Sequence, residues 1–204
     1  IGPSESMSKS KKNVIDPQSV IEMYGADAVR WFVLSDSPPE RDIQWSDEGI
    51  SGSYKFVQKV WNISEKINSI QEKKELVHEV QNDLDKLINK LIKDITYNIE
   101  HFHFNVAVAK FYEFINALSK ILSDNEIDKE KYQSIFKQFL ILIYPFLPHL
   151  ASECWEKITK EQNLHCQNWP VFDEKLLVVE EINLVIQING KKRAILLVKP
   201  DISE

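Results

Sequence analysis

Apolar residues recur at steps of three and four positions along most of this 204-residue chain, and this spacing constrains its fold more than any other feature. Such a period places the apolar side chains on one face of an α-helix. Three long runs show it, over Phe56–Ile70, Leu84–Ile99 and Ala109–Leu122, and shorter helices are predicted over 132–144 and 149–160. Consecutive amphipathic helices favour an antiparallel helical bundle, so the chain is predicted to be mainly α-helical.

Two shorter helices are predicted before the first long run. Asp16 followed by Pro17 is a helix-start signal, because an aspartate at the N-cap accepts backbone N–H bonds and proline is well tolerated at the first helical position. This helix is expected to end near Tyr24, before Gly25. A second helix is predicted over residues 26–35.

The C-terminal end has a different pattern. Asn183–Ile188 has the β-branched content of a strand, and Asn189-Gly190 is the strongest two-residue hairpin signal. The segment "RAILLV" supplies the returning strand. A β-hairpin is therefore predicted at the C-terminal end of an otherwise helical chain.

Composition limits the classes of function. The net charge of −6 argues against a protein coated with nucleic acid and leaves local basic patches for any RNA contact. No apolar run reaches the roughly 18 to 20 residues of a membrane helix, so no membrane partner is expected. The two cysteines, Cys154 and Cys166, match no zinc-binding spacing. We therefore predict no metal site and a reducing, cytoplasmic setting.

A short basic segment near the N-terminus carries the strongest chemical signal. In Ser8-Lys9-Ser10-Lys11-Lys12, ammonium groups alternate with hydroxyls. These groups suit a polyphosphate, because in phosphoryl transfer a protein acts mainly by placing positive charge where negative charge develops. A solvated turn has the same composition, and five residues alone do not separate the two interpretations.

Several separated blocks carry a family resemblance. The first is "MSKSKKNVIDP" followed by "YGADAVRWFVLSDSPP", which resembles the KMSKS loop of class I aminoacyl-tRNA synthetases and the helices behind it. The block "DIQWSDEGISGSYKFVQKVW" is most similar to the leucyl-tRNA synthetases. The blocks "FNVAVAKFYEFINAL" and "PFLPHLASECWE" resemble the helical anticodon-binding domain of the class. Finally, "NWPVFDE" and "VIQINGKKR" resemble the passage of the leucyl enzymes into a small C-terminal domain.

The resemblance assigns roles to residues of the basic segment. The KMSKS motif falls on Ser6, Met7, Ser8, Lys9 and Ser10, so Ser6 replaces the first lysine of the motif. Lys9 matches the second lysine, which implies that it is catalytic and meets the phosphates of ATP. The implied ATP-binding residues are Met7, Ser8, Lys9, Ser10 and Lys11. The isoleucyl and valyl enzymes usually have glycine where Lys12 stands, which favours the leucyl enzymes.

The implied function is that of a leucine–tRNA ligase, which activates leucine with ATP, assisted by Mg²⁺, and transfers it to tRNA(Leu). Three domains are expected: the KMSKS loop and linking helices over 1–45, the helical tRNA-binding domain over 46–170, and the start of the C-terminal domain over 171–204. The chain lacks a His-x-Gly-His signature. We therefore expect it to be a piece of a longer, monomeric enzyme and to be inactive alone. The alternatives are an isoleucyl or valyl enzyme, or a non-catalytic helical RNA-binding module.

Two rows of lysines are candidates for contact with RNA, and the sequence does not choose between them. One row is Lys55, Lys59 and Lys66, and the other is Lys86, Lys90 and Lys93. Each shares a helix face that could follow an RNA backbone or simply face solvent.

Other conspicuous residues have structural interpretations. Arg30 is expected to pair with Asp27 on the same helix. His101 and His103 are expected to be structural or exposed. The tryptophans in or beside apolar runs are expected in the core, namely Trp31, Trp45, Trp61 and Trp155.

Overall fold

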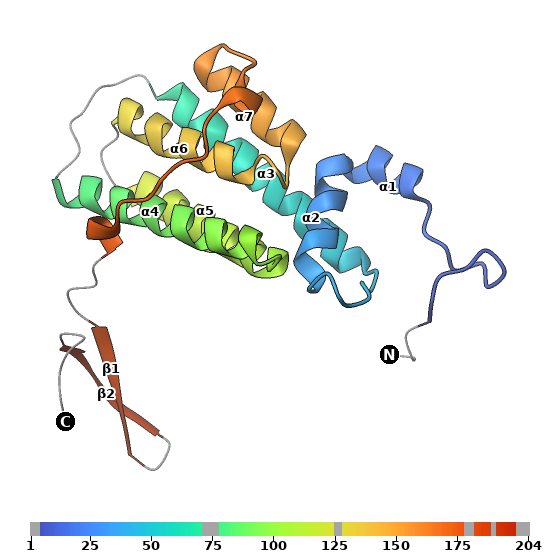
Figure 1. Cartoon of the computed structure of the whole chain (residues 1–204), viewed down its shortest axis with the longest axis horizontal. Coiled ribbons are helices and arrows are strands. Elements are labelled where there is room, and N and C mark those ends of the chain that lie inside the picture. The colour runs from blue at the N-terminus through green and yellow to red at the C-terminus, as the bar shows by residue number, and fades with distance from the viewer. Residues whose placement is uncertain (1–4, 71–77, 125–127, 178–181, 189–190, 199–204) are drawn as a thin grey trace. The chain divides into compact units, whose positions relative to one another are not determined.

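The computed structural model describes residues 5–70, 78–124, 128–177, 182–188 and 191–198. The chain divides into two compact units, residues 1–172 and residues 173–204 (Figure 1). The described part of the first unit is helical, and the described part of the second holds two paired strands. The prediction of a mainly α-helical chain is confirmed.

The described part of the first unit contains seven α-helices. These are α1 (Pro17–Tyr24), α2 (Ala26–Asp36), α3 (Asp47–Ser69), α4 (His78–Glu100), α5 (Phe104–Asp124), α6 (Lys129–Ile143) and α7 (Pro148–Thr159). A short 3₁₀ helix, η1 (Leu164–Cys166), follows α7. Helix α3 packs against α2, α5, α6 and α7, and α4 packs against α5 and α6. Within the described residues, no helix is both long and apolar enough to span a membrane.

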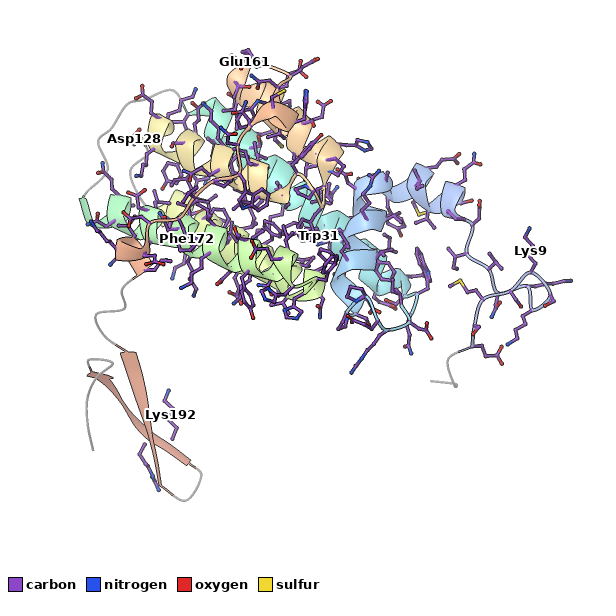
Figure 2. The ribbon with its side chains drawn as sticks, in the orientation of Figure 1. Lys9, Trp31, Asp128, Glu161, Phe172 and Lys192 are labelled. Atoms are coloured by element: carbon purple, nitrogen blue, oxygen red, sulfur yellow. The ribbon has the colours of Figure 1, made fainter. Side chains whose placement is uncertain are left out.

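Trp31 of α2 anchors that helix in the main core. Its side chain is fully buried. The indole stacks on Phe56 of α3, with ring centroids 4.3 Å apart and planes only 6° apart. Its Nε1 donates a hydrogen bond to the Tyr112 hydroxyl of α5 at 3.3 Å, and Phe146 meets the ring edge-on. Figure 2 shows Trp31 among the helices, so α2 belongs to the bundle.

Three further tryptophans also pack in or beside the core. Trp155 is buried and donates from Nε1 to Asn163 Oδ1 at 2.9 Å. Trp45 is half-buried against Phe32. Trp61 is half-buried beneath the Lys157 ammonium, which lies 3.8 Å from its ring centroid. The predicted core position is confirmed for Trp31 and Trp155, whereas Trp45 and Trp61 are partly buried and pack against the core.

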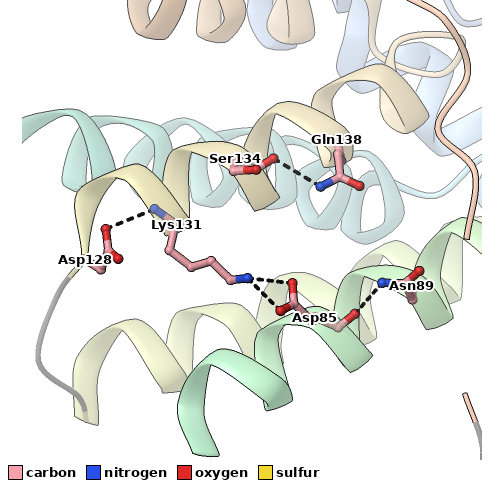
Figure 3. A network of polar contacts seen from close by, with 6 residues as sticks. All are labelled: Asp85, Asn89, Asp128, Lys131, Ser134 and Gln138. Carbon is pink, nitrogen blue, oxygen red and sulfur yellow. Dashed lines mark hydrogen bonds and ion pairs between the residues drawn. The ribbon is translucent and has the colours of Figure 1, made fainter. Parts of the chain in front are cut away.

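Helix α6 begins earlier than the apolar pattern predicts, and polar contacts explain the difference. The apolar residues start at Tyr132, but the helix starts at Lys129 because Asp128 is its N-cap. The Asp128 carboxylate accepts a hydrogen bond from the Lys131 backbone N–H at 3.1 Å. The Lys131 ammonium then reaches both carboxylate oxygens of Asp85 on α4, at 2.6 and 2.7 Å (Figure 3). These contacts fix the start of α6 against α4.

The second unit contains a 3₁₀ helix, η2 (Glu174–Leu177), and two strands, β1 (Ile182–Ile188) and β2 (Lys191–Val198). The strands pair antiparallel. The register shifts within the pair: Ile186 opposes Ala194 while Gln187 opposes Lys192, which leaves Arg193 as a bulge. The predicted turn at Asn189-Gly190 lies outside the described residues.

Candidate functional site

The loop before α1 folds into a tight turn over Ser8–Lys12. The backbone N–H of Lys11 donates to the Ser8 carbonyl oxygen, and that of Lys12 donates to the Lys9 carbonyl oxygen, both at 3.2 Å. The hydroxyls of Ser8 and Ser10 share a hydrogen bond at 3.2 Å. This turn places Lys9 at the outer end of the loop, where its side chain is exposed (Figure 2).

The three lysines of the turn differ in their surroundings. The Lys11 ammonium lies 3.5 Å from the Glu5 carboxylate, and both side chains are at least half exposed, so the pair is weak. Lys9 has no hydrogen-bond or ion-pair partner for its side chain among the described residues. Lys12 has a φ of 54°, in the left-handed region that glycine adopts most easily.

Asn13 closes the turn, and the sequence analysis did not assign it a site role. Its Oδ1 accepts a hydrogen bond from the Ser8 backbone N–H at 2.8 Å. Its Nδ2 donates to the Ser6 carbonyl oxygen at 3.3 Å. One amide side chain therefore ties together the two ends of the loop. The available signal was the tendency of asparagine to bond nearby backbone groups in turns.

The other motif residues lie on the same exposed loop. Ser6 and Met7 precede the turn, and Met7 is 48% exposed. Ser6 is the residue predicted to stand at the place of the first lysine of the KMSKS motif, and its side chain carries no charge. The structure brings all the predicted site residues onto one loop, while their roles toward ATP stay predictions.

Asp16 fixes the point at which the loop becomes helix α1. Its side chain accepts hydrogen bonds from the backbone N–H groups of Gln18 and Ser19. The Ser19 hydroxyl also donates to it, at 2.5 Å. These hydrogen bonds hold the pKa of the Asp16 carboxyl below its ordinary value. The bond from the Ser19 hydroxyl has the largest effect, and the two backbone bonds have smaller ones. The predicted N-cap is confirmed, and Pro17 occupies the first helical turn.

A small second core holds α1 against the bundle. Ala28 and Phe32 of α2 and Ile50 of α3 are buried together. Val20 and Tyr24 of α1 pack against this cluster. The basic loop is therefore attached to a packed support through α1.

Gly49 allows α2 and α3 to approach within this second core. A Cβ atom at position 49 would lie 2.6 Å from Phe32 Cε2 and 2.7 Å from Ser46 Oγ. The backbone N–H of Gly49 also donates to Ser46 Oγ at 3.0 Å, which caps α3. At Gly52 the same test finds no atom within 4 Å. The first glycine of the block resembling the leucyl enzymes therefore has a packing role here, and the second does not.

Asp27 joins α2 to the start of α7. The side chain of this residue is only 8% exposed. It accepts hydrogen bonds from Arg30 Nη1 at 2.8 Å and from the Leu150 backbone N–H at 2.7 Å. Its Oδ1 also lies 3.5 Å from His149 Nδ1. The N-cap residue of α7, Leu147, supplies no side-chain bond, so Asp27 caps α7 from another helix. The predicted pairing with Arg30 is confirmed, and the longer contact is new.

The N-terminal segment leaves much apolar surface uncovered. Six large apolar side chains at positions 7–43 are at least 42% exposed: Met7, Val14, Ile21, Met23, Val33 and Ile43. They lie on the loop, α1, α2 and the α2–α3 connection. Another part of a longer protein would find apolar side chains on this segment to pack against.

Cysteines and histidines form no metal-binding group within the described part of the chain. Cys154 is buried, and burial raises the pKa of its thiol to about 11. Cys166 is exposed. His101 is also exposed and stacks on Tyr97, with ring centroids 4.1 Å apart.

Comparison with known families decides what kind of chain this is. A family model described as the anticodon-binding domain of tRNA ligase matches residues 81–204, more than half of the chain. The chain belongs to this family of tRNA-ligase domains. Residues 3–46 of this anticodon-binding-domain protein match a second model, tRNA synthetases class I (I, L, M and V). Residues 47–80, which contain helix α3, lie between the two matches.

Individual relatives of this tRNA-ligase chain point to one member of the class. A leucine–tRNA ligase of Bartonella quintana is 41% identical over 211 residues, covering all of this chain and 24% of the relative. One of Ruegeria pomeroyi is 40% identical over 202 residues, covering 99% of this chain and 23% of the relative. The chain thus spans about a quarter of the length of these relatives. The resemblance to the leucyl enzymes is confirmed.

A solved structure supports the same relationship. The crystal structure of a ternary complex of Agrobacterium radiobacter K84 LeuRS with tRNA and LeuAMS is similar to this chain, with a TM-score of 0.77 and 26% sequence identity. The match covers 97% of this chain and 26% of that one.

Proposed function

We propose that the chain is part of a leucine–tRNA ligase that activates leucine with ATP and transfers it to tRNA(Leu). The relatives that match it along its whole length carry this name. The observation that carries the proposal is Lys9. It is exposed on a turn that matches the KMSKS motif, and its ammonium has no acidic partner among the described residues.

In the first step, the leucine carboxylate attacks the α-phosphate of ATP. Leucyl-adenylate forms as the bond between the α- and β-phosphates breaks and pyrophosphate leaves. Negative charge builds up on the leaving pyrophosphate, and the Lys9 ammonium stabilises it there. Lysine suits this role as a mobile point charge at the end of a flexible side chain. In the second step, the terminal ribose hydroxyl of tRNA(Leu) attacks the leucyl carbonyl and releases AMP.

The rest of the loop supports Lys9. Ser8 and Ser10 offer hydroxyl donors to the phosphates, and Met7 directly precedes them on the loop. Lys11 adds charge once a polyphosphate competes with Glu5, because an exposed ion pair is easily replaced. In this way Lys11 compensates in part for Ser6. Mg²⁺ assists ATP in the full enzyme, but the described residues offer no group of ligands for it, so no step is assigned to it here.

The proposed domain arrangement follows the resemblance. Residues 1–45 belong with the catalytic domain, residues 46–170 form the tRNA-docking helical domain, and residues 171–204 begin the C-terminal domain. The uncovered apolar side chains at positions 7–43 support the first assignment, because they would pack against the remainder of a catalytic domain. We further propose that the enzyme is a cytoplasmic monomer.

The proposed division of labour implies that the 204 residues are inactive alone, since the amino-acid pocket lies elsewhere in the enzyme. ATP–pyrophosphate exchange by the isolated chain should stay at background with any amino acid. Exchange above background would contradict this assignment.

Amino-acid preference tests the proposed substrate. The full-length protein should catalyse ATP–pyrophosphate exchange with leucine far faster than with isoleucine or valine at equal concentrations. Preference for isoleucine or valine would identify a different enzyme of the class. Absence of exchange with all three would favour a non-catalytic RNA-binding module.

A further inference from the structure

One face of the bundle holds a groove lined by lysines. The groove lies between α3 and α5 and has a volume of about 340 Å³. Its lining consists of Lys55, Gln58, Lys59, Asn62, Ile63, Lys66, Ser119 and Leu122. These residues include three ammonium groups, three neutral polar side chains and two apolar ones, but no carboxylate. A chain with a net charge of −6 therefore has a local site that is positively charged.

The lysines of this groove are free to meet an external anion. Lys59 donates to the amide oxygen of Asn116 on α5, a neutral partner that orients it without cancelling its charge. Lys55 and Lys66 have no ion pair among the described residues. The nearest acid in sequence, Glu65, is engaged by the Lys157 ammonium.

The helix itself places no acid beside these lysines. Residues three and four positions away on a helix are its surface neighbours. Around Lys55, Lys59 and Lys66, all such positions are polar and neutral, apolar, glycine or lysine. The absence of acids at these positions leaves the groove without the local ion pairs that commonly neutralise an exposed helix face.

The second lysine row, on α4, has a different environment. Asp83 precedes Lys86 by three positions, and Asp94 follows Lys90 by four, so the row alternates in sign. Lys93 lies over the ring of Phe172, 5.9 Å from its centroid. The two rows thus differ in the acids beside them on their helices and in the contacts of their lysines.

The spacing of the groove lysines selects an extended anion. Lys59 and Lys66 are seven residues apart on α3, which is about 10 Å along a helix. A single phosphate cannot span that distance, whereas successive phosphates of a nucleic acid backbone can. Lys55 extends the row by one further turn.

We propose that the groove between α3 and α5 binds the phosphodiester backbone of tRNA through Lys55, Lys59 and Lys66. This inference rests on the proposed function and assigns tRNA docking to one face of the helical domain. The α4 row has no part in it. Because these contacts are to phosphates, they add affinity and position the tRNA without reading its sequence.

The salt dependence of tRNA binding tests the proposal. In the full-length protein, the triple variant Lys55→Gln, Lys59→Gln and Lys66→Gln keeps helix-forming side chains and removes three charges. The plot of log K against log salt for a tRNA(Leu) transcript has a negative slope. Its steepness should decrease by about two to three, because each lost phosphate contact removes about 0.7–0.9 from it. Affinity at 0.1 M salt should fall by at least about tenfold. The double variant Lys55→Gln and Lys66→Gln preserves the Lys59–Asn116 bond and should show about two thirds of the slope change.

The matched control removes charge from the other row. Lys86→Gln and Lys90→Gln should leave the slope within about 0.5 of wild type, the scale of less than one phosphate contact. An unchanged slope in the double and triple α3 variants, or an equal decrease in the α4 control, would overturn the groove assignment while leaving the proposed function intact. Wild-type protein that fails to bind tRNA(Leu) would instead contradict the proposed function itself.

Discussion

At the scale of single residues, Asp27 connects the loop-bearing helices to the bundle. Its carboxylate accepts a hydrogen bond from the Leu150 N–H at the start of α7, where the N-cap residue of the helix makes no side-chain hydrogen bond. It also holds Arg30 on α2. A buried N–H that loses its acceptor costs the full desolvation penalty of that group. Asp27 therefore stabilises a contact between two helices that are far apart in sequence.

Removing this carboxylate should destabilise the protein measurably. Asp27→Ala is expected to lower the free energy of unfolding by about 1–3 kcal/mol. Asp27→Asn retains an acceptor for Leu150 and should cost less. Urea unfolding of the 204-residue chain measures both. Asp42→Ala serves as the control, because this exposed aspartate has no side-chain partner among the described residues, and it should stay within about 0.5 kcal/mol of wild type. Equal losses in Asp27→Ala and Asp42→Ala would contradict the cap.

Residue-scale contacts are also where prediction from sequence was least complete. The cap at Asp16 was predictable, because both partners lie within three positions. The hydrogen bond from the Leu150 N–H to Asp27 joins residues 123 positions apart, and the spacing of apolar residues does not predict it. Asn13 is an intermediate case. Its preference for turns was visible, but its two bonds across the loop depend on a backbone path that only the structure shows.

At the scale of elements, apolar spacing predicted the helices well and their ends less well. The recurring apolar residues identify the face of the helix that packs against the core. They carry no information about the polar residues at which the helix begins. Helix α6 accordingly starts at Lys129, where Asp128 caps it, rather than at the first apolar residue. The sequence already shows acids beside the lysines of α4 and none beside those of α3, but the groove between α3 and α5 is seen only in the structure.

The approach of α2 to α3 depends on one of two glycines that look alike in sequence. In Gly49→Ala, the new methyl group would collide with the Phe32 ring and the capping Ser46 hydroxyl. The expected loss is about 1–2 kcal/mol, in the range of overpacked sites. In Gly52→Ala the methyl group meets no atom within 4 Å. That variant should gain about 0.5–1 kcal/mol from helix propensity.

Thermal or urea unfolding of the two alanine variants makes a paired comparison within one helix. The difference in sign is the diagnostic result. Stabilisation by both substitutions would show that α2 and α3 do not approach as closely as described here.

At the scale of the whole molecule, the core contains two acidic groups that folding keeps neutral. Burial raises the pKa of Tyr132 from 10.0 to about 12. Burial likewise raises the pKa of Cys154 from 9.0 to about 11. In the unfolded chain both groups ionise near their ordinary values, so above pH 9 the unfolded state releases protons that the folded state retains. Stability from these groups is thus complete below about pH 9 and is lost progressively as the pH rises toward 12.

Alkaline unfolding should show this dependence. The urea midpoint of wild type should fall between pH 8 and pH 11. Cys154→Ala should be less stable at pH 8, because it leaves a cavity, yet should lose less between pH 8 and pH 10. Parallel pH profiles for the two proteins would rule out Cys154 as a contributor. Thiol labelling gives an independent check, since exposed Cys166 should react quickly and buried Cys154 only after unfolding.

The central claim is that Lys9 acts on the pyrophosphate leaving group of leucine activation. Leucine-dependent ATP–pyrophosphate exchange by full-length protein carrying Lys9→Ala measures it most directly. Activation should slow by roughly 10²- to 10³-fold, the usual cost of removing one preorganised donor. The matched variant Lys11→Ala removes an equal charge from the same turn and should slow activation less, because this lysine is partly paired with Glu5. A near-unchanged rate in Lys9→Ala, or equal losses in both variants, would contradict the account.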